Sequence, residues 1–215
     1  MLSILRHRLT RSYDPLVEYF IYCRDRTGSM PRRMELVEAH WSFMDPYGDA
    51  MIARGPTLLD DETATGSMHV VDLPDAAAAR AFAFDEPNYR AGVYGDVLMR
   101  RWRTIAGGRM WDYTGGVDGY ERFLVIGHAR LGQGAARESL DDDYRRYLTG
   151  PGLGDRVIVA GTLLSEDGAE WMGTALMVEL PDREAAEAVL PQGPGGRAGL
   201  YESVEVHSWE FGGRR

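Results

Sequence analysis

Residues 90–102 read RAGVYGDVLMRRW, and residues 197–209 read RAGLYESVEVHSW. Both stretches begin with Arg-Ala-Gly, share a tyrosine and a valine, and close on a tryptophan at the same spacing. Further matches keep the same separation along the chain, namely Gly66 with Gly173 and Leu73-Pro74-Asp75 with Leu180-Pro181-Asp182. A repeat of this length is a whole domain and not one unit of a solenoid. The chain therefore contains one domain twice.

The repeat divides the 215 residues into five segments. We expect an N-terminal extension at 1–17, a first repeat at 18–104, a glycine-rich linker at 105–119, a second repeat at 120–211 and a tail at 212–215. Each repeat is small enough to be only marginally stable by itself. The two repeats are therefore expected to pack on each other as an intramolecular pseudo-dimer, and further homodimerisation stays open.

Within each repeat the pattern predicts strand, helix, strand, strand, helix, strand. The apolar run at 19–23 predicts the first strand. A first helix is expected from Ser29 to Met44, with apolar residues at steps of three and four, and a second from Asp75 to about Asp85. This order is the ferredoxin-like βαββαβ unit, in which both helices cover one face of an antiparallel sheet. Because the open face must also be covered, the expected fold class is α+β, with two ferredoxin-like repeats packed as an intramolecular dimeric α/β barrel.

Composition narrows the classes of function. With 33 acidic and 24 basic residues, the net charge of −9 argues against nucleic-acid binding. All the basic residues are arginine, and the lack of lysine excludes Schiff-base chemistry and a Walker-A phosphate loop. No apolar run approaches membrane-spanning length. The single cysteine, Cys23, allows no internal disulfide, so we expect a cytoplasmic protein without a membrane partner.

His40 is the strongest catalytic candidate. It lies on the flank of the apolar stripe of the first predicted helix, and Tyr144 occupies its position in the second repeat. Histidine is the natural acid or base near neutral pH, and a neighbouring carboxylate fixes its tautomer. Asp85 is the predicted carboxylate, because the two helices lie side by side on the sheet, and Gln192 replaces it in the second repeat. The structural alternative is a half-buried histidine capped by a surface acid.

Five further residues are candidates for contact with a substrate: Arg24, Trp41, His69, Tyr89 and Arg90. Arg24 has the charge to hold an anionic group, and the aromatic residues suit a pocket wall. Arg24, His69 and the aromatic residues each have a structural alternative: Arg24 in a solvated loop, the aromatic residues in the core, and His69 as a polar residue of the sheet face. A metal site formed by His40, His69 and an acid is the weaker alternative, because no pair of histidines has a metal-ligand spacing. We expect no metal and no cofactor.

The chain resembles the YCII-related domain family. The residues that carry the resemblance are Tyr19-Phe20-Ile21-Tyr22, Arg33 leading to His40, Ala53-Arg54-Gly55-Pro56, Gly66-Ser67, Asp85-Glu86-Pro87 and Arg90-Ala91-Gly92 ending in Trp102. The second repeat matches more thinly, through Ala160-Gly161, Gly173-Thr174, Arg197-Ala198-Gly199 and Trp209. The resemblance implies a dimeric α/β barrel with a suspected histidine–aspartate dyad, roles that fall on His40 and Asp85. The best-understood relatives of the family include chloromuconolactone dehalogenases, which remove HCl from a small lactone.

We therefore expect an enzyme of the lyase or isomerase type. His40, oriented by Asp85, would move a proton on a small lactone, aromatic or polyketide-like metabolite, and so drive elimination, isomerisation or cyclisation. Arg24 or backbone amides would hold the developing oxyanion. Two alternatives stay open: a non-catalytic small-molecule-binding or assembly module, and a cofactor-independent oxygenase of the dimeric α/β barrel type.

Overall fold

The computed structural model describes residues 17–213. The N-terminal extension expected at 1–17 therefore lies outside the described residues, apart from Val17, as do residues 214–215. Among the described helices, none has the length and apolar character needed to cross a lipid bilayer.

Eight antiparallel strands close into one barrel in the order β1-β3-β2-β8-β5-β7-β6-β4. The first repeat contributes β1 (Val17–Asp25), β2 (Met51–Leu58), β3 (Ala64–Leu73) and β4 (Tyr94–Gly107). The second contributes β5 (Glu121–Ala129), β6 (Val157–Leu164), β7 (Trp171–Leu180) and β8 (Tyr201–Trp209). The predicted fold class is confirmed: the chain makes its own dimeric α/β barrel.

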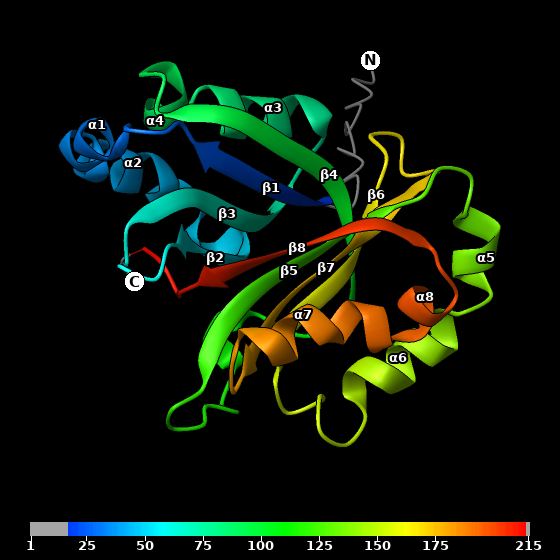
Figure 1. Ribbon diagram of the computed structural model, residues 1–215. Coiled ribbons are helices and arrows are strands. Elements are labelled where there is room, and N and C mark those ends of the chain that lie inside the picture. Colours follow the sequence, from blue (N-terminus) through cyan, green and yellow to red (C-terminus); the bar gives the residue numbers. More distant parts are fainter. Residues whose placement is uncertain (1–16, 214–215) are drawn as a thin grey trace, which may run out of the picture.

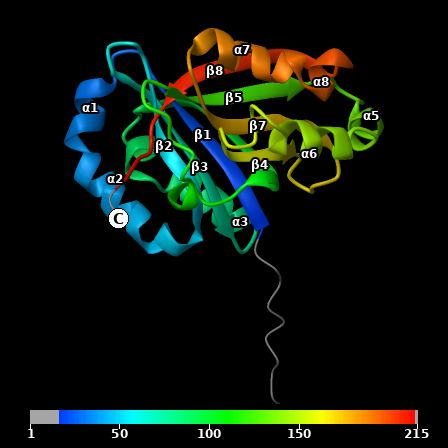
Figure 2. The ribbon, with the colours of Figure 1, turned by 90° about the horizontal axis from the view of Figure 1, so that it is seen from below.

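Helices cover the barrel on two opposite sides (Figures 1 and 2). The first side carries α1 (Met30–Glu35), α2 (Val37–Met44), η1 (Asp45–Ala50), α3 (Ala76–Phe84) and α4 (Pro87–Arg90). The second side carries α5 (Gly134–Glu138), α6 (Asp141–Thr149), α7 (Arg183–Gln192) and α8 (Pro194–Arg197), and η2 (Met110–Asp112) lies in the connection between the repeats. The repeated Leu-Pro-Asp has a direct structural role, because Asp75 and Asp182 cap the first turns of α3 and α7.

The strands alternate between two environments, as successive residues of a strand must. Phe20 and Tyr22 of β1 point into the barrel and join a buried cluster that fills it. Tyr19 and Ile21 point outward and pack beneath the helices of the first repeat. A third cluster lies beneath the helices of the second repeat. The barrel interior is therefore a packed core, and the space for a ligand lies on a helix-covered side.

The first predicted helix is wrong in one respect, since it is two helices. The chain leaves helical geometry at Leu36, with φ −102° and ψ 1°, so α1 and α2 meet at an angle. Met34, which was expected on the buried stripe, is 57% exposed as a result. Because of this break, α1 and α2 run over the sheet in different directions.

The connection between the repeats is more ordered than the expected linker at 105–119. Strand β4 continues to Gly107, because Arg101 to Gly107 pair with β6 of the second repeat. Arg109 then donates hydrogen bonds to the carbonyls of Asp49 and Met51 at 2.7 and 2.8 Å. Met110 is buried. The glycines here bring the backbone of the connection close to its neighbours.

The opposite junction of the barrel, between β2 and β8, is short. Its ladder pairs Thr57 with Trp209 and the next residue of β2 with Ser208. Beyond β8 the chain stays beside β2, where Gly212 N donates to Arg54 O at 3.1 Å. A Cβ at Gly55 would lie 1.8 Å from the Glu210 carbonyl oxygen. Glycine is therefore required here for the two backbones to approach.

Replacing Gly55 with alanine is expected to lower the free energy of unfolding by about 1–3 kcal/mol, because the added methyl forces the two backbones apart. Urea denaturation measures the change. Gly48→Ala is the matched control, since a Cβ at Gly48 meets no atom within 4 Å. Equal losses in the two variants would contradict the close contact.

Candidate functional site

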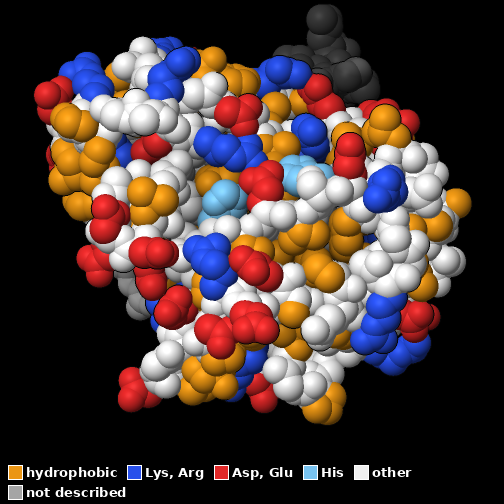
Figure 3. All heavy atoms as spheres, viewed as in Figure 1, with side chains coloured by type: hydrophobic (Ala, Val, Ile, Leu, Met, Phe, Trp, Pro, Cys, Tyr) orange, Lys and Arg blue, Asp and Glu red, His pale blue; other side chains and the backbone are white. Residues whose placement is uncertain are grey.

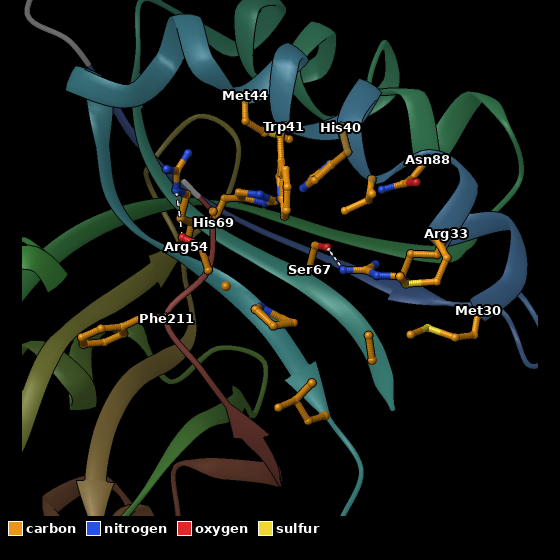
Figure 4. Close-up of a pocket in the computed structure, with 18 residues that line it drawn as sticks. Met30, Arg33, His40, Trp41, Met44, Arg54, Ser67, His69, Asn88 and Phe211 are labelled. Carbon is orange, nitrogen blue, oxygen red and sulfur yellow. Dashed lines mark hydrogen bonds between the residues drawn. The ribbon is translucent and has the colours of Figure 1, made fainter. Parts of the chain in front are cut away.

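A cavity of about 270 Å³ lies between α1–α2 and the sheet of the first repeat (Figure 4). Its walls are mostly apolar and come from the helices, β2 and the tail: Met30, Met34, Val37, Trp41, Met44, Pro56, Leu58 and Phe211. The polar side chains that line it are Arg33, His40, Arg54, Ser67, His69 and Asn88. An apolar cavity with a few converging polar groups is the usual form of a small-molecule site.

His40 is held by a carboxylate in the cavity wall. Its Nδ1 lies 2.6 Å from Oε1 of Glu86, and the two side chains are only 14% and 3% exposed. The other carboxylate oxygen of Glu86 accepts the backbone N–H of Tyr89 at 2.9 Å, which fixes the carboxylate at the start of α4. With Nδ1 directed at Glu86, Nε2 is the ring nitrogen left to exchange a proton with a bound molecule.

The predicted pairing of His40 with Asp85 is wrong. Asp85 follows the last residue of α3, is exposed, and forms a surface ion pair with Arg90 at 2.7 Å. The next residue, Glu86, turns inward as the N-cap of α4, whose first residue is Pro87. The signal in the sequence is this Glu-Pro step, because a proline at the first position of a helix makes the preceding residue its cap.

Trp41 and His69 line the cavity as predicted, whereas Tyr89 and Arg90 do not. Arg90 is occupied on the surface by Asp85. The ring of Tyr89 packs edge-on against Phe84, with centroids 4.9 Å apart. Both residues belong to the short α4 segment, whose outer side faces away from α2.

Arg24 also lies away from the cavity. It is part of β1, and it forms an ion pair with Glu205 at 2.9 Å across the mouth of the barrel. Glu205 also accepts hydrogen bonds from His128 and His207, and these partners hold the pKa of its carboxyl far below its usual range. Figure 3 shows histidine side chains beside arginine and acidic side chains near the middle of the face that it draws. Arg24 therefore ties the two repeats together and is not an oxyanion ligand of the cavity.

A second polar network, which the predictions missed, supports the floor of the cavity. Arg33 of α1 donates to Asp25 at 3.0 Å and to Ser67 Oγ at 2.7 Å. Tyr94 donates to the same Ser67 oxygen, and Asn88 donates to the Tyr94 hydroxyl. Burial raises the pKa of Asp25 to about 6, despite the opposing charge of Arg33. Arg33 stands seven residues before His40, on a helix that the sequence pattern did not separate from α2.

His69 lies on the sheet opposite α2 and is 3% exposed. Its ring centroid is 6.2 Å from that of His40, and Phe82 packs edge-on against it. Burial holds the pKa of His69 well below its ordinary value, and the charges of His40, Arg54 and Arg33 act in the same direction. His69 is therefore a neutral imidazole in the cavity wall at physiological pH.

The tail of the second repeat completes the site of the first. Arg54 is buried on β2, and its Nε donates to the carbonyl of Gly212 at 3.2 Å. Phe211, Gly212 and Gly213 all line the cavity. The sequence carries no signal for this contact, because it depends on where β8 meets β2. Residues 212–213, which belong to the expected tail at 212–215, are part of the candidate site.

The second repeat lacks this arrangement. At the positions of His40, Glu86, His69 and Asn88 it has Tyr144, Gly193, Leu176 and Gly195. Tyr144 is buried and its hydroxyl lies 2.7 Å from that of Tyr201. A Cβ at Gly195 would lie 1.6 Å from the Tyr144 hydroxyl, so the ring fills the space beside α8. At these four positions, packing has replaced the imidazole, carboxylate and amide groups of the first repeat.

Within residues 17–213, no group of three or more histidine, cysteine, aspartate or glutamate side chains is arranged to hold a metal ion. Cys23 is buried beneath the helices of the first repeat, and burial raises the pKa of its thiol. It packs as a small apolar residue.

Comparison with known proteins places the chain in a family. The model of the YCII-related domain matches residues 17–103 and again 122–210, as the duplication predicts. An uncharacterized protein of Haemophilus influenzae is 25% identical over 95 residues, which cover 40% of this chain and 97% of that protein.

Solved structures are also similar to this chain. The 5-chloro-2-hydroxyhydroquinone dehydrochlorinase of Burkholderia phenoliruptrix, in complex with 2,5-dihydroxybenzoquinone, is 27% identical over 40% of this chain and 93% of its own, with a TM-score of 0.38. Chlorite dismutase from Candidatus Nitrospira defluvii is 12% identical and covers 90% of this chain and 91% of its own, with a TM-score of 0.55. The second likeness extends over both repeats and concerns the fold.

The neutrality of His69 predicts a pH dependence of stability. The unfolded chain binds a proton at this residue below its ordinary pKa of 6.5, whereas the folded chain does not. Between about pH 7 and about pH 5, the wild-type protein should therefore lose about 1–2 kcal/mol more unfolding free energy than His69→Leu. Urea titrations at each pH measure this, and parallel curves would contradict a buried neutral His69.

Proposed function

The chain belongs to the YCII-related domain family, and we propose that it is an enzyme whose first repeat uses His40 and Glu86 for general acid–base catalysis on a small molecule. One observation carries the proposal: the 2.6 Å contact between Nδ1 of His40 and Oε1 of Glu86 in the wall of a largely apolar cavity. A carboxylate that fixes the tautomer of an imidazole, and stabilises it when it becomes charged, is a recurring device of acid–base sites.

His40 Nε2 takes a proton from a carbon next to a carbonyl group of the substrate. The electron pair of the broken C–H bond forms a carbon–carbon double bond, and the carbonyl pair moves onto oxygen. The resulting enolate then re-forms the carbonyl group in one of two ways. It expels a leaving group from the next carbon, and the His40 imidazolium passes its proton to that leaving group, or it recovers the proton at another position from the imidazolium. The first outcome is an elimination and the second an isomerisation, and both need only a base that returns to its starting state.

The walls of the cavity support a small, mostly apolar substrate. Trp41 offers a flat aromatic surface, and Met30, Met34 and Met44 offer flexible side chains that adapt to the shape of a ligand. A volume of about 270 Å³ suits one small ring compound better than an extended chain. We therefore propose a small lactone, aromatic or polyketide-like metabolite as substrate, and elimination, isomerisation or cyclisation as the reaction.

The loss of these groups from the second repeat supports one site per chain. Tyr144 and Gly193 cannot form the imidazole–carboxylate pair, and the Tyr144 ring occupies the space that a substrate would need. The second repeat instead contributes Phe211 and the residues after it to the cavity of the first.

An elimination that requires only a base tests this proposal without knowledge of the natural substrate. A nitrobenzisoxazole loses a carbon-bound proton, its N–O bond breaks, and a coloured phenolate is released. We expect the wild-type protein to accelerate this reaction and His40→Gln to lower the rate by about 100-fold or more. Glu86→Gln should lower it by about 10-fold or more, because the imidazole loses its orienting charge.

Asp85→Asn is the matched control, since it removes the adjacent, exposed carboxylate and should leave the rate unchanged. Thermal unfolding of each variant shows whether the fold is retained. If wild type and His40→Gln react at the same rate, the chain is a small-molecule-binding module and not a base catalyst.

A further inference from the structure

We propose that His69 is a second catalytic residue of the cavity. Its Nε2–H donates a hydrogen bond to the substrate oxygen on which negative charge develops when His40 removes the proton. The inference rests on the proposed function of His40 and gives a separate task to a separate side chain.

The two imidazoles approach the cavity from different layers. His40 extends from α2 and His69 from β3, and both line the same space (Figure 4). Their ring centroids are 6.2 Å apart and the rings are tilted by 55°. One small carbonyl compound can therefore contact both, with its acidic carbon at His40 and its oxygen at His69.

The hydrogen bonding of His69 identifies the atom that acts. Nδ1 is fully buried and has no hydrogen-bond partner among residues 17–213. Only Nε2 can reach a molecule in the cavity. A buried acceptor without a partner is tolerated more readily than a buried N–H without one. The proton therefore belongs on Nε2, which makes the exposed edge of the ring a donor.

Burial suits His69 to this task. A neutral imidazole in an apolar wall donates a hydrogen bond without first having to be charged, and it polarises a carbonyl group in this way in other enzymes. Arg33, Arg54 and His40 surround it and oppose its protonation. The two histidines thus have different roles: His40, beside Glu86, accepts a proton, and His69, beside cations, stays neutral and retains its N–H proton.

The second repeat shows that the fold has no need of a histidine here. Leu176 takes the equivalent position and is completely buried. Burying an imidazole with an unpartnered nitrogen costs free energy that leucine does not. The histidine occurs in the repeat that also has His40 and Glu86, which supports a chemical role for it.

The step balances without an oxidant or reductant. The C–H bond breaks and the proton goes to His40 Nε2, while the electron pair forms the new double bond. The carbonyl electron pair moves to oxygen, where the hydrogen bond from His69 strengthens as the charge grows. No proton leaves His69.

A phenolate mimics the charged oxygen of an enolate, so p-nitrophenolate is the probe, and neutral nitrobenzene, which lacks that oxygen, is its control. At about pH 8 the wild-type protein should bind the phenolate more tightly than nitrobenzene. His69→Leu, the residue of the second repeat, should weaken phenolate binding by about 10- to 100-fold and leave nitrobenzene binding unchanged. His69→Gln should restore part of the loss, because its amide N–H lies near the position of Nε2–H.

The elimination of nitrobenzisoxazole supplies the kinetic readout. His69→Leu should lower kcat by about 10-fold with little change in KM, again with partial rescue by glutamine. Unchanged phenolate binding or unchanged kcat in His69→Leu would overturn the proposal, as would failure of the wild-type protein to bind the phenolate. His40→Gln should lose elimination but keep phenolate binding. The two assays therefore distinguish failure of the proposed role of His69 from failure of the proposed role of His40.

Discussion

The open, apolar face of each four-stranded sheet is the constraint on which the rest of this structure depends. Helices cover one face of a ferredoxin-like sheet, and the other must find a partner or remain in water. Phe20, Tyr22 and Trp102 of the first repeat meet Leu124 and Trp209 of the second inside the barrel. Because the two repeats are connected in one chain, their association is intramolecular, and each sheet meets its partner at a high effective concentration. Barrel closure then fixes the positions of the helices and of the cavity beneath them.

Closure also brings segments from opposite ends of the chain into one site. Strand β2 lies next to β8, so the backbone after Trp209 runs beside Arg54 and Gly55 and places Phe211 at the cavity. At the other junction, β4 pairs with β6 and continues into the connection. The cavity of the first repeat is thus built by both repeats, although its acid–base pair comes from one.

The sequence was sufficient to predict the barrel and part of the site. Constant spacing between the copies revealed two domains, and the open sheet face required them to pack. His40, Trp41 and His69 reach the cavity because strand and helix periodicity fixes their side of each element. The carboxylate partner of His40 was predicted one residue too early, at Asp85 instead of Glu86. The end of α3 turns the chain, so that Glu86 points inward and Asp85 points outward. Contacts such as that of Arg54 with Gly212 depend on strand register between distant segments, which no local pattern encodes.

Tyr144 illustrates what fusion of two copies permits. In a barrel made from two identical chains, every substitution occurs in both halves, so one that fills a cavity in the first half fills it in the second as well. In this chain the two halves are encoded separately, and each can change alone. The second half can therefore fill its cavity with the ring of Tyr144, which packs over Gly195. Filling the cavity increases the free energy of unfolding, because an open cavity lowers it. The stability gained in the second half offsets the cost of polar groups in the first half, which can then retain residues such as His69 whose burial lowers the free energy of unfolding.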